Sequence, residues 1–217
     1  MVSILITAGP TREYLDDVRF LSNGSSGRMG FALAEAAEAA GCATTLVLGP
    51  VEAQVPAQLH VVAVTSALEM QAAAEREFAG CNIAIAAAAV ADWRPAQRDD
   101  GKPAHHAGPW SLPLVPNPDI VAGLAAQKGQ RIVVGFALES TRAGMTAAIA
   151  RGRAKLAKKR LDLVVVNLHD TIGSSAAEFV LCHVDGRDEA LGPQSKSAAA
   201  ARIVEAAVQL WRTRGTT

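Results

Sequence analysis

The densest group of polar side chains lies between Arg19 and Gly27, in the stretch RFLSNGSSG. Asparagine and serine supply amide and hydroxyl donors, and the glycines leave backbone N–H groups accessible to a ligand. Arg19 stands four residues before Asn23 and can add a bidentate clamp for phosphate or carboxylate. The stretch therefore indicates an anion-binding loop with Asn23, Ser25, Ser26 and Gly27 as candidate contacts. The alternative is a solvated loop in which Ser26 only caps a helix.

A second candidate group follows a run of small residues, 86–91, that contains Ala88 and ends at Asp92. Small side chains at a strand end let a ligand approach the backbone closely, and ligands of open α/β sheets bind at such ends. The Asp92 carboxylate can bind a hydroxyl group, a base edge or a metal-bound water. Alternatively, Asp92 is an ordinary aspartate of a surface turn, and the sequence favours neither interpretation.

Basic side chains form the remaining candidates. Lys155 and Lys159 are four residues apart in a predicted helix, so they share a face that suits a polyphosphate. Lys102 stands in a proline-rich arm near His105 and His106, a pair without further ligands at a metal-binding spacing. Alternatively, each of these lysines is a solvent-exposed side chain with no role in binding.

The elements that would position these groups alternate between strand and helix. The capping box from Ser66 to Glu69 marks the start of one helix. We predict strands over 3–8, 44–48, 60–64, 83–90, 132–137 and 163–167, helices over 27–40, 67–79, 120–128, 146–160 and 195–214, and a small hairpin over 178–191. This order predicts an α/β fold with a modified Rossmann-like, doubly wound, mainly parallel sheet and flanking helices.

Two segments depart from the alternation. The loop after the first strand is too long for an ordinary βα connection, and it matches neither G-x-x-x-x-G-K-[ST] nor G-x-G-x-x-G. The segment 92–117 is rich in proline, which predicts a flexible arm or flap with a short strand over 110–115. Asn117-Pro118-Asp119 then predicts a helix start, with Asn117 as the cap.

Length and composition set broader limits. With 217 residues, we expect one domain over 1–217. Lysine plus arginine and aspartate plus glutamate balance at 21 each, so nothing indicates general affinity for nucleic acid or membranes. Three scattered cysteines fit a reducing compartment. We find no signal peptide and no apolar run near the ~20 residues of a membrane span, and we expect a cytoplasmic location.

Six sequence blocks together resemble one family. They are TAGPTRE, VRFLSNGSSGRMGFALAEAA, AAVADW, NPDI, VGFALES and AKLAKKRLDLVVVN, in this order and spacing over 3–212. The chain is similar to phosphopantothenoylcysteine synthetase (phosphopantothenate–cysteine ligase) of coenzyme A biosynthesis, the ligase domain of the bacterial bifunctional flavoprotein. The resemblance implies a Rossmann-like homodimer. It also leaves a separate decarboxylase as a candidate partner, because that activity is commonly fused to the family.

The resemblance further implies a two-step reaction. The carboxylate of 4′-phosphopantothenate attacks the α-phosphorus of CTP, pyrophosphate leaves, and an acyl-cytidylate forms with Mg²⁺ present. The amine of cysteine then attacks the acyl carbon and CMP departs. Bacterial members use CTP, whereas animal enzymes use ATP, and no flavin is needed for this half of the pathway.

Residue roles are carried over from the family by position. Arg19, Asn23 and Ala88 match contacts to the acyl phosphate and substrate, and Lys102 matches a flap lysine that stabilises charge in cytidylate formation. The implied nucleotide contacts are Asp92, Asn117, Pro118, Asp119, Ile120, Phe136, Lys155 and Lys159. No metal ligands are assigned. The flap reads KPAH rather than K-x-K-K, so two family lysines are missing and protonated His105 is a partial substitute.

Other functions stay open at this point. The altered flap fits a paralogue with a different acid or amine substrate, and it also fits a nucleotide-binding module that has lost catalysis. A dinucleotide oxidoreductase is a fold-level alternative that lacks its glycine fingerprint.

Overall fold

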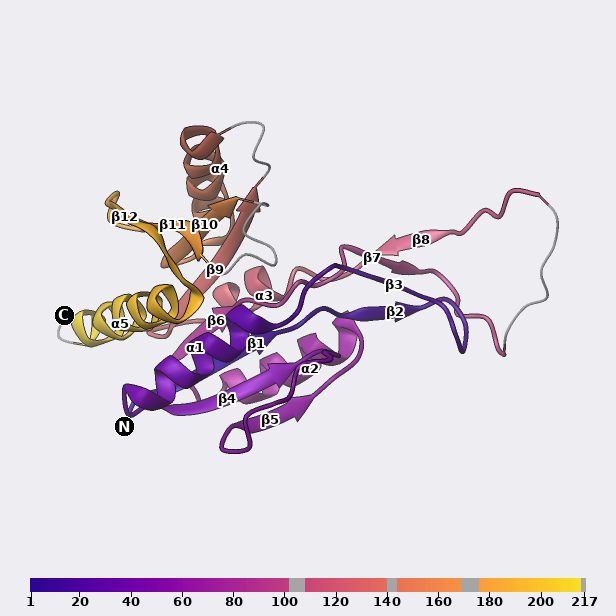
Figure 1. Cartoon of the computed structure of the whole chain (residues 1–217), viewed down its shortest axis with the longest axis horizontal. Helices are drawn as coiled ribbons and strands as arrows, with labels where there is room; N and C mark the ends of the chain where they lie inside the picture. Colours follow the sequence, from indigo (N-terminus) through magenta and orange to yellow (C-terminus); the bar gives the residue numbers. More distant parts are fainter. Residues whose placement is uncertain (102–107, 140–143, 169–175, 216–217) are drawn as a thin grey trace.

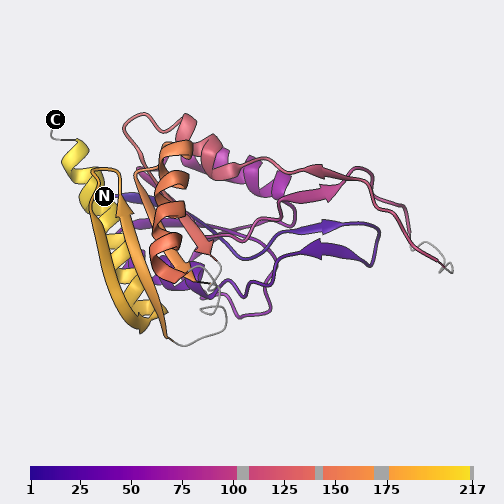
Figure 2. The same cartoon turned by 90° about the horizontal axis from the view of Figure 1, so that it is seen from above.

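The computed structural model describes residues 1–101, 108–139, 144–168 and 176–215. Within these residues, eight strands form one sheet with helices on both faces, and two short hairpins form an arm that projects from it. Both views show the arm extending well beyond the sheet (Figures 1 and 2). Lys102, His105 and His106 lie outside the described residues.

The sheet is doubly wound. Six strands are parallel in the order β5 (His60–Ala63), β4 (Ala43–Leu48), β1 (Ser3–Ala8), β6 (Ile83–Ala86), β9 (Ile132–Glu139) and β10 (Leu163–Leu168). The antiparallel strands β11 (Ala176–His183) and β12 (Asp188–Ser195) extend the β10 edge as the predicted hairpin. From β1 the chain adds β4 and β5 on one side, then crosses back to place β6 on the other side of β1 and continues to β9 and β10. This is the Rossmann strand order, so the predicted fold class is confirmed.

The helices cover the two faces because the central strands are apolar on both sides. Ile4 and Ile6 pack into one core with α1 (Arg28–Ala39) and α5 (Lys196–Arg214). Leu5 points the other way, into a second core with α2 (Ala67–Phe78), α3 (Ile120–Ala126) and α4 (Gly144–Lys159). In the parts of the chain that are described, no helix is both long and apolar enough to cross a membrane.

Gly30 brings the first turn of α1 against the carboxyl end of β1. A Cβ atom built on Gly30 would lie 2.2 Å from the Cβ atom of Ala8, which is far inside van der Waals contact. Only glycine therefore allows this approach. The close packing holds the start of α1 beside the end of the strand, where the polar loop must present its groups.

Two predictions were wrong about the arm. The long loop after β1 contains a hairpin of β2 (Arg12–Tyr14) and β3 (Phe20–Ser22). The predicted strand over 110–115 is instead β8 (Leu114–Pro116), which pairs with the unpredicted β7 (Trp93–Pro95). Strands of three residues outside the main core carry too little hydrophobic alternation to be recognised.

Two boundaries also differ. The strand predicted over 83–90 ends as β6 at Ala86, and the chain beyond it follows β1 through the Ala87 N–H to Thr7 C=O bond at 3.0 Å. The helix cap is Asp119, which accepts from the Ala122 N–H at 3.1 Å, rather than Asn117. The Asn117 amide is used elsewhere, because it donates to the Ala91 C=O at 2.9 Å.

Candidate functional site

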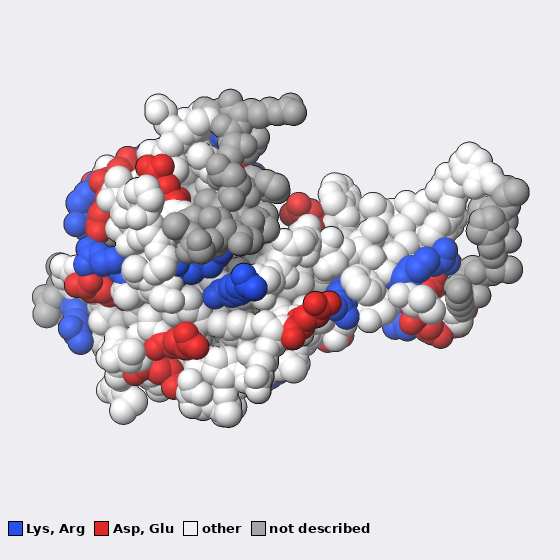
Figure 3. Space-filling model, in the orientation of Figure 1, with Lys and Arg blue, Asp and Glu red and all other residues white. Residues whose placement is uncertain are grey.

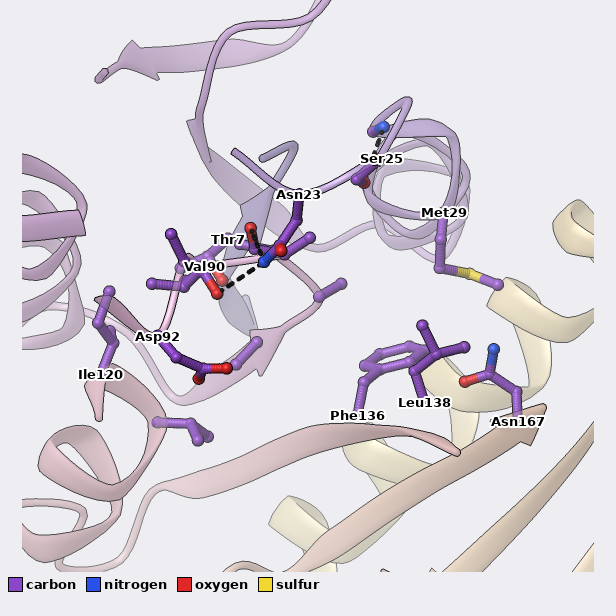
Figure 4. A pocket seen from close by; sticks show the side chains of 18 of the residues that line it. Thr7, Asn23, Ser25, Met29, Val90, Asp92, Ile120, Phe136, Leu138 and Asn167 are labelled. Atoms are coloured by element: carbon purple, nitrogen blue, oxygen red, sulfur yellow. Dashed lines mark hydrogen bonds between the residues drawn. The ribbon is translucent and has the colours of Figure 1, made fainter. Parts of the chain in front are cut away.

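A cavity of about 900 Å³ opens at the carboxyl ends of β1, β6 and β9. The strand order reverses between β1 and β6, which is the position where open α/β sheets bind ligands. Figure 4 shows side chains from the polar loop, from the segment after β6 and from β9 facing this space.

Most of the predicted site residues line this cavity. They are Asn23, Ser25, Ser26, Gly27, Ala88, Asp92, Asn117, Pro118, Asp119, Ile120, Phe136, Lys155 and Lys159. Several segments that are distant in sequence therefore meet at one place. The roles of the individual residues stay predictions, and Lys102 lies outside the described residues.

Asn23 joins two walls of the cavity. Its side-chain nitrogen donates to the Val90 C=O at 3.0 Å and to the Ala89 C=O at 3.3 Å (Figure 4). The side-chain NH₂ group of Asn23 therefore holds the polar loop against the segment that follows β6. The side-chain oxygen of Asn23 remains as an acceptor at the cavity.

The two predicted phosphate-binding lysines have carboxylate neighbours. Lys159 Nζ lies 2.8 Å from Asp119 Oδ2, and Lys155 Nζ lies 3.6 Å from Glu139 Oε1. Glu139 also accepts a hydrogen bond from Arg151. Asp119 is half exposed, at 48%, so its pair with Lys159 is partly screened by solvent, whereas Glu139 is exposed to only 13%.

Asp92 is an exposed carboxylate at the cavity (Figure 4). Within the described residues its carboxylate has no hydrogen-bond or ion-pair partner, while its backbone C=O accepts from the Asn117 N–H at 2.8 Å. The described residues contain no cluster of three or more His, Cys, Asp or Glu side chains that could hold a metal ion by themselves.

Arg19 is not at this cavity. Its guanidinium pairs with Asp16 at 2.6 Å and lies 4.6 Å from the ring centroid of Trp110, within the arm. The backbone N–H of Arg19, followed by that of Val18 and by the Arg19 guanidinium, lowers the pKa of Asp16 to about 2. The predicted anion clamp is therefore paired with an internal carboxylate in this structure.

Sequence reasoning did not select several residues that line the cavity, namely Thr7, Arg28, Met29, Leu138, Asn167, Phe179 and Lys196. Arg28 lies within the SNGSSGRMG block, and its position next to the polar loop could have been used to predict that it lines the cavity. Lys196 begins the last helix, and only the packing of α5 against α1 brings it to the cavity. Surface charges on the face in view are mixed in sign (Figure 3).

Fold and site together define a doubly wound α/β domain with a phosphate-compatible cavity at its switch point. The chain belongs to the DNA/pantothenate metabolism flavoprotein C-terminal domain family, whose model matches residues 1–210. The family indicated by the sequence motifs is thereby confirmed.

Two curated relatives match the same region. The chain is 46% identical over 170 residues to the coenzyme A biosynthesis bifunctional protein CoaBC of Escherichia coli K12, which covers 76% of this chain and 41% of the relative. It is 46% identical over 166 residues to a cysteine/cysteine sulfinic acid decarboxylase of an unknown prokaryotic organism, covering 76% and 45%. The chain thus spans less than half the length of these relatives.

Solved structures share the fold. The crystal structure of the C-terminal domain of CoaBC has a TM-score of 0.81 and 31% identity, and the match covers 100% of this chain and 97% of that one. A Cab2 mutant, H337A, in complex with phosphopantothenate-cysteine has a TM-score of 0.79, 18% identity and coverage of 100% and 89%. Because the identity is only 18%, the second match shows a shared fold and nothing about function.

Proposed function

We propose that this chain forms one ligase domain that joins 4′-phosphopantothenate to cysteine and converts CTP to CMP and pyrophosphate. The observation that carries the proposal is the single cavity that gathers Asn23, Asp92, Lys155 and Lys159 at the switch point. Membership of a family with relatives named for coenzyme A biosynthesis supports the choice of substrates. A cytoplasmic location stays a prediction.

The first half-reaction needs positive charge around a triphosphate. Lys155 and Lys159 can exchange Glu139 and Asp119 for phosphate oxygens, since a phosphate offers each lysine a charge-assisted hydrogen bond in place of the one to the carboxylate. The substrate carboxylate then attacks the α-phosphorus, the bond to the pyrophosphate oxygen breaks, and an acyl-cytidylate forms. The family flap lysine, Lys102, is proposed to neutralise charge in this step.

Mg²⁺ fits this site through Asp92. Mg²⁺ commonly uses one or two carboxylates together with substrate phosphates and waters, and Asp92 offers at the cavity a carboxylate that pairs with no other described residue. When bound, the ion would neutralise phosphate charge. We propose no role for a flavin.

The second half-reaction depends on the segment that Asn23 holds. The cysteine amine attacks the acyl carbon, the bond from that carbon to the CMP oxygen breaks, and the amine loses a proton. Asn23 fixes the carbonyls of Ala89 and Val90, and its free oxygen can accept a hydrogen bond from the incoming amine. Ala88, Ser25, Ser26 and Gly27 are proposed to bind the acid substrate beside it.

We also propose a homodimer assembled through the arm. Phe20, Trp93, Trp110 and Leu114 expose large apolar side chains on the arm, at 39–52% of their full area. A second copy is the proposed partner because Arg19 cannot act at its own cavity while it stays in the arm. Light scattering that gives a monomer mass at micromolar concentration would contradict this arrangement. A decarboxylase, fused or separate, is the proposed functional partner.

Pyrophosphate release tests the ligase directly. The full chain is incubated with CTP, Mg²⁺ and 4′-phosphopantothenate, with and without cysteine, and ATP replaces CTP in a parallel series. We expect pyrophosphate release that depends on the acid, and CMP release that depends on cysteine. CTP binding without any pyrophosphate release would favour the nucleotide-binding module, and turnover with only another acid would favour the paralogue.

A further inference from the structure

Thr11 is a fully buried polar residue between β1 and the arm. It is 0% exposed, and it is not among the described residues that line the cavity. The residue before it, Pro10, still forms an isolated parallel bridge with Ala89, and the residue after it begins β2. A buried hydroxyl group is costly unless it is hydrogen-bonded. Thr11 therefore acts through its hydrogen-bond partners and not through contact with a ligand.

The Thr11 hydroxyl continues a backbone ladder. Beyond β6, the Ala89 N–H donates to the Gly9 C=O at 2.9 Å. Donors alternate along a parallel ladder, so the next one is the Ala91 N–H. It donates to Thr11 Oγ1 at 3.0 Å. A side-chain oxygen thus takes the place of the Thr11 carbonyl, and the segment that follows β6 stays attached to the chain after β1.

The Thr11 carbonyl is therefore available to a second partner. It accepts a hydrogen bond from Ser22 Oγ at 2.7 Å, and Ser22 is the last residue of β3. The next residue, Asn23, donates to the carbonyls of Ala89 and Val90 (Figure 4). Thr11 and Asn23 thus join the same two cavity walls, the polar loop and the segment that follows β6, at two separate points.

The other side of this segment is held as well. The Asn117 side chain donates to the Ala91 C=O at 2.9 Å, and its backbone N–H donates to the Asp92 C=O at 2.8 Å. Ala91 is only 6% exposed, so removal of the Thr11 hydroxyl would leave the Ala91 N–H buried without its partner. The residue just before Asp92 would then be held at its carbonyl alone.

We propose that Thr11 is a positioning residue, whose two oxygens set the relative placement of Asn23 and Asp92 across the cavity. The inference rests on the proposed function, in which Asn23 serves the cysteine step and Asp92 serves the nucleotide. A small displacement of groups beside the reacting atoms lowers the rate, because the bound geometry must match the transition state. Loss of the Thr11 hydroxyl therefore slows turnover more than it weakens CTP binding.

Three variants of the full chain test this role. Thr11→Val removes the hydroxyl at nearly constant shape, and Thr11→Ser keeps it. Thr44→Val is the matched control, because Thr44 is a buried threonine of β4 whose hydroxyl donates to the Cys42 C=O at 3.3 Å, and it does not line the described cavity. Rapid-quench assays with CTP, Mg²⁺, 4′-phosphopantothenate and cysteine are run where circular dichroism shows every variant to be folded.

The rates should separate the variants. We expect Thr11→Val to release CMP about tenfold or more slowly than wild type, the loss expected when a buried donor is left unpaired beside the reacting groups. Thr11→Ser should recover most of the rate, and Thr44→Val should match wild type. Calorimetry should show that CTP affinity falls less than the rate does in Thr11→Val.

Hydrogen exchange followed by NMR reads the position of the segment without turnover. The Ala91 amide should exchange about tenfold or more faster in Thr11→Val than in wild type, relative to the amide of Ile6 in the buried strand β1, which reports global opening. The side-chain NH₂ signals of Asn23 should shift in the same variant. Thr44→Val should show neither change.

The outcomes are distinct. Wild-type turnover in folded Thr11→Val overturns the inference. Slow turnover with unchanged Ala91 exchange and unchanged Asn23 signals also overturns it, since Thr11 would then not act through this segment. If wild type itself releases no pyrophosphate, the proposed ligase fails, but faster Ala91 exchange and shifted Asn23 signals confined to Thr11→Val would still establish that Thr11 fixes the two cavity walls.

Discussion

The Lys159 ammonium lies 2.8 Å from Asp119 Oδ2 and links the last residue of α4 to the N-cap of α3. The same carboxylate accepts from the Ala122 N–H at 3.1 Å. Asp119 therefore starts one helix and holds a cation at the cavity edge. Because the Asp119 side chain is half exposed, at 48%, a phosphate can take over the lysine without a large cost in stability.

Lys159→Gln should weaken CTP binding by about tenfold or more, since a charge-assisted contact to phosphate is lost. The free energy of unfolding should change by no more than about 1 kcal/mol, because the Asp119 partner is half exposed and the pair is partly screened by solvent. Calorimetry and urea unfolding measure the two effects, and Lys158→Gln is the control for losing a lysine from α4. Unchanged CTP affinity would remove Lys159 from the nucleotide site.

Asn23→Asp should leave pyrophosphate release in place and slow the cysteine-dependent release of CMP by about 100-fold or more. The carboxylate cannot donate to the Ala89 and Val90 carbonyls, so the segment beside the acyl group loses its fixed position. Rapid-quench assays follow pyrophosphate and CMP separately, and CTP affinity of the same variant is the internal control. Both half-reactions at the wild-type rate would show that Asn23 has no catalytic role.

Gly30→Ala should destabilise the fold by about 1–3 kcal/mol, the usual cost of overpacking a core. Its added methyl would lie 2.2 Å from the Ala8 Cβ atom, so α1 must move away from β1. Chemical denaturation measures the loss. Gly80→Ala is the control, because the nearest atom to a Cβ there is the Glu77 carbonyl oxygen at 4.0 Å. Equal stability of the two variants would contradict the close packing.

Asp16 should make the arm sensitive to acid. The Arg19 backbone N–H, with the Val18 N–H and the Arg19 guanidinium, lowers the folded-state pKa of Asp16 from 3.8 to about 2. A lowered pKa contributes stability that is complete above the unfolded-state value and is lost as the pH falls from 3.8 towards 2. Wild type should therefore exceed Asp16→Asn in Tm at pH 6.

The control for Asp16 is the same comparison in acid. The Tm difference between wild type and Asp16→Asn should shrink as the pH falls from 3.8 to about 2 and vanish only below the folded-state pKa, where Asp16 is protonated and uncharged. Thermal scans at several pH values give the difference directly. A Tm difference that stays constant from pH 6 down to about 2 would mean that the hydrogen bonds to Asp16 do not stabilise its charged form.

The main elements could be predicted because their signals are local. The capping box is one case, since Ser66 Oγ accepts from the Glu69 N–H at 3.2 Å and Glu69 accepts from the Thr65 N–H at 2.7 Å. The apolar strands and amphipathic helices were likewise predicted from patterns of neighbouring residues. Their alternation along the chain predicted the doubly wound sheet. The β2–β3 and β7–β8 hairpins were missed because three-residue strands outside the core leave no such periodicity.

By itself, the sequence determined the family, the alternation of strands and helices, and most of the segments that supply the cavity, because these depend on residue types within short blocks of the chain. The tertiary structure decided which charges meet. Asp119 lies 40 residues before Lys159 yet bonds to it, and the packing of α1 on α5 brings Arg28 and Lys196 to one cavity. Electrostatic attraction and repulsion depend on distance in space, and spacing along the chain does not contain that distance.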